Sequence, residues 1–392
     1  MFAGLEQDEL IAAADESSRL AGSDPESFRA RGIARLAAGK PSEAAKEFAH
    51  ATSLRPRHYL LWMDLGRALD QADDVPGATN SFREAVKLAP YFSQPRWQLA
   101  NVLFRAEKYG EAFPELRRAI AADPALLPLS MELAWAGSRG DAQVFIQMLG
   151  PSNTSQRLVA GRFLAKHGKA REAVELFRSA GGIADEDQRA LVKELVNAKQ
   201  FAEGYEVWAS GRRGVDLANR GMASITDGGF ESRIARDDPG FGWQANSEVA
   251  TFRVSLDAGE KHEGGRSLRL EWNGESNPQS QLVTQIVLVE RDSSYRLTFS
   301  ALAKALLTGG LPVIVVSDAT STEYKVLGKS DSISEGQQAW SDYKVEFKTG
   351  VETRAVLLSL QRNPCSGAGC PIFGRVWLDD FKLVKTSGGV RD

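Results

Sequence analysis

The stretch WMDLGRALDQADDVPGATNSFREAVKLAP, from Trp62 to Pro90, decides the fold of the N-terminal half of the chain. It ends in a proline that belongs to a series, because Pro56, Pro90 and Pro124 are separated by 90 − 56 = 34 and 124 − 90 = 34 residues. Large apolar and small side chains also return at matching positions in each interval. A fixed period of this length is the sequence signature of an array of helical repeats.

The repeating positions resemble those of the tetratricopeptide repeat (TPR), a pair of antiparallel helices that approach closely where side chains are small. The second unit fills these positions with Trp62, Leu65, Gly66, Leu69, Ala78, Phe82, Ala85 and Pro90. The first unit keeps Phe28, Gly32, Ala44, Phe48, Ala51 and Pro56, and the third keeps Leu99, Ala100, Leu103, Ala112, Leu116, Ala119 and Pro124. The resemblance implies a solenoid that holds other molecules together.

The array continues past Pro124 in a weaker form, with further helix pairs over residues 127–148, 161–180 and 191–208. Units unlike the consensus are expected at the end of a solenoid, where one face has no neighbour to cover it. The sequence therefore predicts about six helix pairs between Leu5 and Ser210. Asp8–Leu20 is interpreted as an N-terminal capping helix.

Strands replace helices after Gly211-Arg212-Arg213-Gly214, where the hydrophobic period falls from about 3.6 to 2. Because the two kinds of element are segregated, we expect separate domains in a multidomain α + β protein, an all-α superhelix followed by an all-β sandwich. The predicted limits are a solenoid over 1–211, a linker over 212–218, a sandwich over 219–386 and a tail over 387–392. The expected strands are 249–256, 267–272, 282–289, 295–303, 313–316, 343–347, 355–360 and 375–384.

An ordered series of motifs in the strand region carries a second resemblance. It comprises Ile225-Thr226-Asp227-Gly228-Gly229-Phe230-Glu231, Gly240-Phe241-Gly242-Trp243, His262-Glu263-Gly264-Gly265-Arg266-Ser267-Leu268 and Val376-Trp377-Leu378-Asp379-Asp380-Phe381. This series is similar to the galactose-binding-like jelly rolls, especially carbohydrate-binding modules of the CBM4/9/22 type, from Leu217 to Lys385. The resemblance implies a jelly-roll sandwich, and it favours this fold more strongly than it favours sugar binding.

The same resemblance implies a structural calcium ion that joins the first strand of the jelly roll to the last, although no cofactor is required. By position, its ligands are the side chains of Glu231 and Asp380, with backbone carbonyls near Gly229 and 262–264. Oxygen-only ligation of this kind suits calcium. The alternative is that both acids are solvated turn residues.

A sugar site on a jelly roll needs an aromatic platform with polar groups around it. Trp272 shares a strand face with Leu268 and Leu270, which favours a place in the core. The resemblance to carbohydrate-binding modules implies core positions for Trp243 and Trp340 as well. Trp377 alternates with its apolar neighbours and is the better platform. Its expected polar companions are Gln285, Tyr324, Gln361 and Arg362.

The first helix of each TPR unit lines a concave groove, so the repeat register predicts the groove residues. They are Arg29, Ile33, Met63, Arg67, Asp70, Trp97, Asn101, Phe104, Met131 and Trp135. Aromatic and Met side chains beside Arg suit capture of a peptide or helix. The alternative for Trp97 and Trp135 is packing against neighbouring repeats or the second domain. A two-residue carboxylate clamp is not supported, since Trp97 stands where its basic residue is expected.

The two cysteines, Cys365 and Cys370, lie in one loop with Gly367 and Gly369 between them. This spacing favours a disulfide and hence an oxidising compartment. The N-terminus lacks the basic and apolar regions of a signal peptide. We therefore expect an extracytoplasmic protein, in the periplasm or cell envelope, whose targeting segment is absent from this chain, with a cytoplasmic location as the alternative.

Composition and motifs exclude several classes of function. The 392 residues carry a net charge of −3, which argues against nucleic acid as the main partner, and no apolar stretch is long enough to span a membrane. Gly328-Lys329-Ser330 lacks the upstream glycine of a phosphate-binding loop, because Glu323 takes its place. The four histidines show no metal or general-base spacing. The protein is not expected to be an enzyme.

The sequence therefore predicts a non-enzymatic adaptor. Its TPR groove binds a protein or peptide, and its jelly roll binds carbohydrate or a second protein. The combined resemblances imply a role in bacterial envelope or exopolysaccharide assembly. The first alternative is a structural interaction protein that binds no sugar, and the second is a carbohydrate-active enzyme without a recognisable motif.

Overall fold

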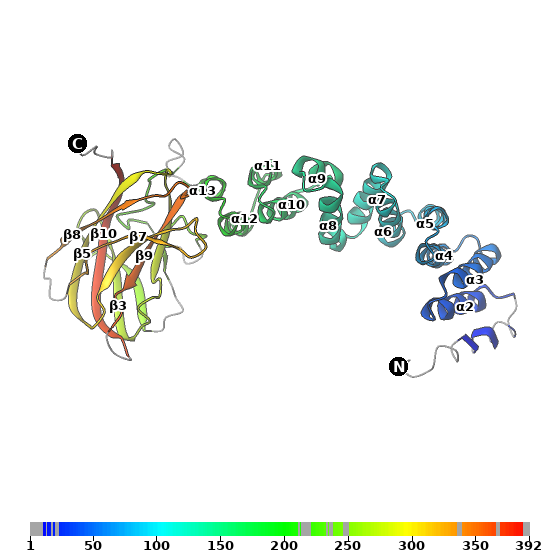
Figure 1. Cartoon of the computed structure of the whole chain (residues 1–392), viewed down its shortest axis with the longest axis horizontal. Helices are drawn as coiled ribbons and strands as arrows, with labels where there is room; N and C mark the ends of the chain where they lie inside the picture. The colour runs from blue at the N-terminus through cyan, green and yellow to red at the C-terminus, as the bar shows by residue number, and fades with distance from the viewer. Residues whose placement is uncertain are drawn as a thin grey trace. The chain divides into compact units, whose positions relative to one another are not determined.

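A computed structural model of the chain describes residues 11, 12, 14–16, 19, 23–210, 212, 221–232, 234, 238–245, 251–334, 339–365 and 369–386. Helices occupy the described part up to Ala209, and strands occupy it from Gln244 onward (Figure 1). The predicted fold class is thus confirmed. The described residues of the expected capping helix Asp8–Leu20 are helical. Apart from Arg212, the predicted linker and tail lie outside the described residues.

The helices follow one another in pairs, as the repeat pattern predicts. The pairs are α2 (Pro25–Ala37) with α3 (Pro41–Leu54), α4 (Tyr59–Gln71) with α5 (Val75–Leu88), α6 (Ser93–Arg105) with α7 (Tyr109–Ala122), α8 (Leu127–Ser138) with α9 (Ala142–Leu149), α10 (Thr154–Lys166) with α11 (Ala170–Ala180), and α12 (Asp185–Asn197) with α13 (Phe201–Ala209). A short 3₁₀ turn, η1 (Pro124–Leu126), precedes α8. Among the described helices, none is long and apolar enough to cross a membrane.

Glycine in the first helix of a unit permits close approach of the second. A Cβ atom at Gly66 would lie 2.6 Å from the Phe82 ring, and one at Gly32 would lie 2.6 Å from the Phe48 ring. Because Gly32 and Gly66 are one period apart, the same contact is repeated in successive units. Large side chains fill the remaining space, and full burial of each contributes roughly 1.5–3 kcal/mol.

A second repeated contact holds the turn that precedes the first helix of a unit. Trp62 donates its indole N–H to the carbonyl oxygen of Pro56, at 2.8 Å. One period later, the Arg96 guanidinium donates to the carbonyl oxygen of Pro90 at 2.9 and 2.8 Å. Both side chains thereby satisfy a carbonyl oxygen two residues beyond the end of the preceding helix, in the turn that leads into the next unit.

The strands form two antiparallel sheets that pack face to face. The first has the order β1 (Gln244–Ala245), β4 (Val283–Leu288), β9 (Ala355–Arg362), β6 (Pro312–Asp318), β7 (Val326–Lys329). The second has the order β2 (Phe252–Asp257), β3 (Ser267–Glu275), β10 (Pro371–Thr386), β5 (Ser294–Thr308), β8 (Ser341–Lys348). The eight expected strands are all present within a few residues. The edge strands β1 and β7 were not predicted.

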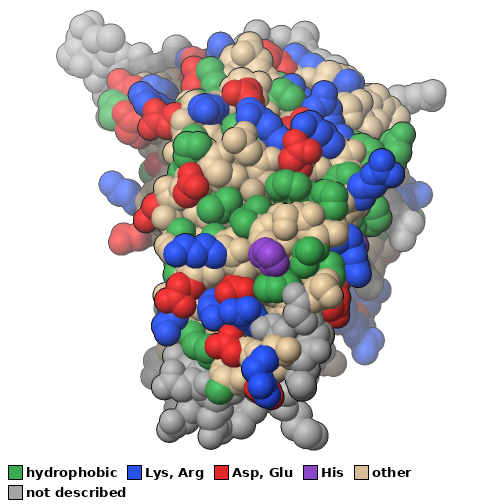
Figure 2. Space-filling view, turned by 90° about the vertical axis from the view of Figure 1, so that its right-hand side faces the viewer, with side chains coloured by type: hydrophobic (Ala, Val, Ile, Leu, Met, Phe, Trp, Pro, Cys, Tyr) green, Lys and Arg blue, Asp and Glu red, His purple; other side chains and the backbone are tan. Residues whose placement is uncertain are grey.

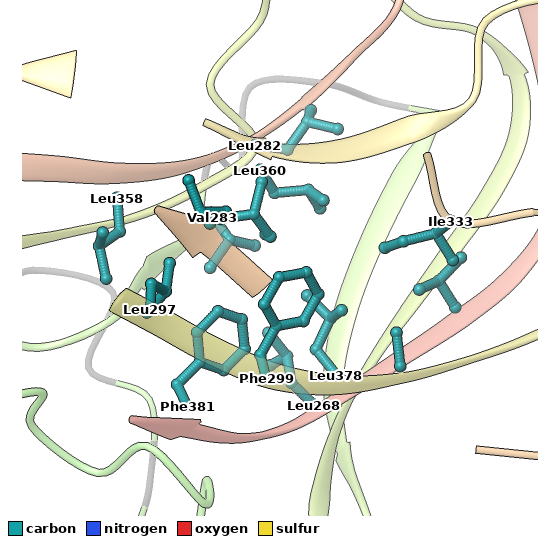
Figure 3. Packing of buried hydrophobic residues seen from close by; sticks show 14 of the residues in the cluster. Leu268, Leu282, Val283, Leu297, Phe299, Ile333, Leu358, Leu360, Leu378 and Phe381 are labelled. Atoms are coloured by element: carbon teal, nitrogen blue, oxygen red, sulfur yellow. The ribbon is translucent and has the colours of Figure 1, made fainter. Parts of the chain in front are cut away.

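Apolar side chains from both sheets form one core (Figure 3). Phe299 of β5 and Phe381 of β10 stack with their ring centroids 4.9 Å apart. Leu268 and Leu378 from the same sheet face Leu358 and Leu360 from the other. Trp272 and Trp243 are buried in this core, as expected from the sequence. Trp340 is not, since it is partly exposed beside His262.

The last helix belongs to the packing of the strand region. Trp208 of α13 is buried, and its indole N–H donates to Asp238 Oδ2 at 2.8 Å. Asp238 Oδ1 also accepts from the backbone N–H groups of Gly240 and Gly242, at 2.9 and 2.8 Å. The Phe241 ring lies 5.9 Å from that of Trp208. Through these contacts, α13 packs against the segment 238–242, which leads into the first strand of the sandwich.

The chain divides into two compact units, Met1–Gln156 and Arg157–Asp392. The first, called here the helical unit, contains the three best repeats. The second, called here the mixed unit, contains α11–α13 and all described strands. The domain limits expected from the sequence mark the change from helix to strand and remain a prediction.

Candidate functional site

The predicted groove residues of the helical unit do not all reach its surface. Met63 is buried in a cluster with Phe82, Leu99 and Leu103, and Met131 is buried as well. The prediction that these two methionines contact a partner is therefore wrong. Their physical role is to fill the space between successive helix pairs, to which the flexible Met side chain is suited.

Paired charges occupy much of the predicted groove. Asp64 of α4 is buried, and its carboxylate accepts from Arg29 Nε of α2 at 2.7 Å and pairs with Arg67 at 3.3 Å. This partner is the main reason why the pKa of the Arg29 guanidinium lies above its ordinary value. Asp70 of α4 pairs in turn with Arg105 of α6. These ion pairs join the first helices of consecutive units and fix their spacing.

The remaining groove residues are partly exposed. Trp97 and Phe104 of α6 and Trp135 of α8 are each half-buried, and Phe104 and Trp135 contact the rings of Phe113 and Phe145 edge-on. The Asn101 side chain donates to the carbonyl oxygen of Trp97 at 3.0 Å, within its own helix. Ile33, in contrast, is 50% exposed. A partner-binding role for Arg29, Arg67, Trp97, Asn101, Phe104 and Trp135 stays a prediction.

An exposed aromatic edge was missed by the sequence analysis. It consists of His58, Tyr59, Tyr91 and Phe92, at the starts of α4 and α6. Tyr91 is 90% exposed and Phe92 is 57% exposed. The Phe92 ring stacks on Tyr59 at 5.4 Å, and Tyr59 stacks on His58 at 6.4 Å. The sequence does contain a signal for this edge. Tyr91 and Phe92 directly follow Pro90, at positions for which the repeat pattern requires no aromatic residue.

Two of the five predicted sugar-binding residues are buried polar groups with protein partners. Gln285 is 1% exposed, and its amide exchanges two hydrogen bonds of 2.9 Å with the backbone of Thr226. Arg362 is 3% exposed, and its guanidinium donates to backbone oxygens around the disulfide loop. Both predictions are corrected. Because each side chain satisfies backbone groups inside the fold, neither can turn toward a sugar without leaving those groups unpaired.

Trp377 is not an open platform either. It lies on the face of its sheet that points away from the core, as expected, but it is 3% exposed. Its indole N–H donates to Asp257 Oδ2 at 2.9 Å, and this bond is the first cause of a lowered pKa of the Asp257 carboxyl. Lys304 and Arg269 lie 5.4 and 6.0 Å from its ring. Charged side chains therefore cover the ring that the sequence assigned to sugar.

The last two predicted sugar residues lie far apart. Gln361 pairs with Val313 at one end of β6, whereas Tyr324 follows the other end of that strand at Asp318. The five steps along the strand from Val313 to Asp318 span roughly 17 Å. Tyr324 is partly exposed, with Lys199 Nζ 4.7 Å from its ring centre. The five predicted residues thus form no common site.

The structure gives the two predicted calcium ligands, Glu231 and Asp380, different partners. Glu231 Oε1 accepts from the backbone N–H groups of Gly265 and Arg266, at 2.7 and 3.2 Å. The Asp380 carboxylate pairs with Lys382 at 2.7 Å, and its role as a calcium ligand stays a prediction. The buried carboxylate at this junction is Asp379, whose Oδ2 accepts from the backbone N–H groups of His262 and Glu263. Burial raises the pKa of the Asp379 carboxyl.

The geometry leaves Glu231 and Asp379 able to hold a hard cation. Asp379 Oδ1 accepts one described hydrogen bond, from its neighbour Asp380, and so retains a lone pair. Gly229 lies near both acids, because a Cβ there would be 3.8 Å from Asp379 Oδ1 and 4.0 Å from Glu231 Cγ. His262, Glu263 and Asp380 place further ligand atoms within 4.8 Å of one another, but on the exposed side.

Calcium is therefore expected to stabilise the mixed unit through Glu231 and Asp379. At a hundredfold excess over its Kd, the ion adds about 2.7 kcal/mol to the folded state, which raises the Tm by about 5 °C. The check is a melting curve in calcium and in EDTA, with Asp379→Asn expected to abolish the difference. Glu346→Gln, which changes an exposed acid of β8 that pairs with Arg296, serves as the control. An equal Tm in calcium and in EDTA contradicts the assignment.

The two cysteines are joined in a disulfide, with their sulfurs 1.93 Å apart. They close the loop between β9 and β10. A cavity of about 490 Å³ opens beside them, lined also by Glu275, Asn277 and Gln279. The described cysteines are thus both paired, and the compartment that they imply stays a prediction.

Charges of both signs are mixed on the surface. Figure 2 shows Lys and Arg interspersed with Asp and Glu on the face that it draws, with hydrophobic side chains in small groups between them. Such a face offers no extended area of one sign for a polyanion.

Comparison with known proteins supports the repeats. Residues 29–91 match the family model of the tetratricopeptide repeat. MamA from Desulfovibrio magneticus RS-1 is 20% identical, over 45% of this chain and 88% of that one, with a TM-score of 0.33. YrrB, described as a TPR protein with an unusual peptide-binding site, is 14% identical, over 50% of this chain and 89% of that one, with a TM-score of 0.29.

A carbohydrate-binding module is also among the similar structures. The CBM22-1 xylan-binding domain of Paenibacillus barcinonensis Xyn10C is 14% identical, over 42% of this chain and 96% of that one, with a TM-score of 0.29. No curated protein matches the chain. The family model is a match at the level of sequence, and it identifies tetratricopeptide repeats at residues 29–91, within the helical unit.

Proposed function

We propose that the helical unit is a non-enzymatic scaffold that binds a protein or peptide partner. The observation that carries the proposal is the aromatic edge. Tyr91 and Phe92 are large apolar residues, and they remain 90% and 57% exposed. Aromatic side chains that reach the surface as a group are typical anchors of protein interfaces, where their burial supplies much of the affinity.

The groove supplies the second part of the docking surface. Its charges are already paired with one another, as in Arg29–Asp64 and Asp70–Arg105, so a partner need not provide counter-charges for them. Ile33 and the half-buried Trp97 then offer apolar contact between fixed polar groups. A groove of this kind suits an extended or helical peptide with apolar residues on one side.

The test begins with peptides selected by phage display on the full-length protein, whose affinities are then measured by fluorescence anisotropy. The double variant Tyr91→Ser/Phe92→Ser is expected to weaken binding at least about tenfold, as loss of an interface anchor does. The control is Val351→Ser, which changes an equally exposed apolar residue of the mixed unit.

The outcome of this test distinguishes docking on the aromatic edge from docking in the groove. Loss of binding in the edge variant alone supports docking on the aromatic edge. Loss in Trp97→Ala or Arg67→Ala alone supports the groove and removes the edge from the proposal. If no peptide is selected, or if binding survives in all three variants, the helical unit is not the docking site.

For the strand region, we propose an interaction or structural role without sugar binding. Gln285, Arg362 and Trp377 are each engaged within the fold, and Gln361 and Tyr324 lie at opposite ends of β6. Carbohydrate binding is the second candidate, favoured by the exposure of the Tyr324 ring. A glycan array is expected to show no binding. Binding to any glycan that is lost in Tyr324→Ala would overturn this part of the proposal.

We also propose that the protein works outside the cytoplasm, in the periplasm or cell envelope. The disulfide supports this location, because such bonds persist in oxidising compartments. The check is alkylation of thiols in intact cells, followed by mass spectrometry. Recovery of Cys365 and Cys370 as free, alkylated thiols in native material would favour a cytoplasmic location instead.

A further inference from the structure

Arg362 is an unusual cation, because it is buried without a counter-ion. Its guanidinium donates to the carbonyl oxygens of Ser276 at 2.7 Å, Cys370 at 2.9 Å and Gly310 at 3.0 Å. Among the described residues, no carboxylate lies within ion-pair distance of it. Burial accordingly lowers the pKa of the Arg362 guanidinium, opposed only by the more distant charge of Glu275. A charge held in this way would be stabilised by any anion that formed in contact with it.

One atom in contact with Arg362 can become an anion. Arg362 Nη2 lies 3.2 Å from the sulfur of Cys370 and donates to it. Cleavage of the disulfide with the negative charge on this sulfur would give the buried guanidinium its missing partner. A thiolate beside an arginine has a lowered pKa, and a thiol of lower pKa is the better leaving group in thiol–disulfide exchange.

The other sulfur is placed for attack. Cys370 is nearly buried, whereas Cys365 is partly exposed, and both line the cavity of about 490 Å³ beside the loop. The turn between β5 and β6 lies against Cys365, since a Cβ at Gly310 would be 3.1 Å from its sulfur. Of the described surroundings of Cys365, the cavity is the open side.

We propose that Cys365 is a site of thiol–disulfide exchange, at which a small thiol forms a mixed disulfide while Cys370 leaves as a thiolate held by Arg362. The attacking thiolate forms a bond to the Cys365 sulfur. The electron pair of the Cys365–Cys370 bond passes to the Cys370 sulfur, so charge is conserved and no separate oxidant is needed. A second thiolate of the same kind can attack the mixed disulfide and release Cys365, leaving the pair reduced.

Glu275 is the charged group that opposes this chemistry. Its Oε2 accepts from the backbone N–H of Cys370 at 3.0 Å, so its negative charge disfavours a thiolate on that residue. Arg362 touches the sulfur itself, whereas Glu275 reaches only the backbone of the same residue. The attraction is therefore expected to exceed the repulsion.

The first test compares two single-cysteine variants that keep Arg362. Both Cys365→Ser and Cys370→Ser lack the disulfide, so any general effect of its loss is common to them. Thiolate absorbance at 240 nm against pH gives the pKa of the remaining thiol regardless of its accessibility. Cys370 is expected to titrate at least about one unit below Cys365. Equal values, or a lower value for Cys365, would overturn the proposal.

A third variant checks the electrostatic cause. Glu275→Gln in the Cys365→Ser background is expected to lower the pKa of Cys370 further, because it removes the opposing charge. Glu323→Gln, another exposed acid, is the matched control and should leave that pKa unchanged.

The second test locates the adduct in the wild-type protein. The chain is treated with glutathione, quenched with N-ethylmaleimide and analysed by peptide mass spectrometry. The expected product carries glutathione on Cys365 and the maleimide on Cys370. Glutathione on Cys370, an even distribution between the two residues, or no adduct at any glutathione concentration up to that which fully reduces the pair would each contradict the proposed direction of exchange.

Discussion

Trp208→Ala is expected to destabilise the mixed unit by about 3–5 kcal/mol, although Trp208 lies in a helix. The indole is buried against Phe241 and donates to Asp238, a buried carboxylate that also holds the backbone of Gly240 and Gly242. Its removal leaves a cavity and takes one hydrogen bond from Asp238. The strand region should therefore melt at a lower temperature than in the wild type.

The measurement is thermal unfolding followed by circular dichroism at a wavelength sensitive to strands. Trp97→Ala is the matched control, because it removes an indole from the helical unit, where Trp97 is half-buried. It is expected to leave the strand transition unchanged. An unchanged strand transition in Trp208→Ala would show that α13 and the sandwich unfold independently.

Arg362→Met is expected to cost about 3 kcal/mol or more in the free energy of unfolding. The methionine fills a similar volume but leaves the carbonyl oxygens of Gly310, Ser276 and Cys370 without their donor. Buried acceptors that lose a partner pay the full cost of desolvation. The loss should appear in all three segments that Arg362 connects, which are the ends of β3 and β5 and the start of β10.

Urea unfolding of the oxidised protein measures this cost. Arg296→Met is the control, because Arg296 is half-exposed and its ion pair among the described residues is with Glu346 on the surface. Its expected cost is below about 1 kcal/mol, as for other surface ion pairs. A similar small cost for Arg362→Met would mean that water replaces the guanidinium and that the site is more open than its burial indicates.

The repeats were predictable because each unit needs the same side chains at the same places. Gly32 and Gly66 stand over Phe48 and Phe82, and no larger residue fits between the helices. The central strands β6 and β9 were equally clear, since each is a short, almost continuously apolar run that is buried on both faces. The edge strands β1 and β7 were missed because a short strand with one neighbour is under little such constraint.

The functional surface was harder to predict for a physical reason. The register correctly places Met63 on the first helix of a unit, but whether its side chain reaches solvent depends on the curvature between units, which sequence does not give. Trp377 shows the same limit. Alternation places it on the outer face of its sheet, yet Lys304 and Arg269 from neighbouring strands cover it. These side chains reach Trp377 because β3 and β5, which are distant in the sequence, pair with β10.

Photo-crosslinking in living cells tests whether the helical unit holds a partner. A photoreactive phenylalanine analogue is placed at Tyr91, at Trp97, or at Val351 of the mixed unit as a control. We expect a discrete crosslinked band from position 91 or 97 and none from position 351. A discrete band from position 351 alone, or none from positions 91 and 97, would contradict it.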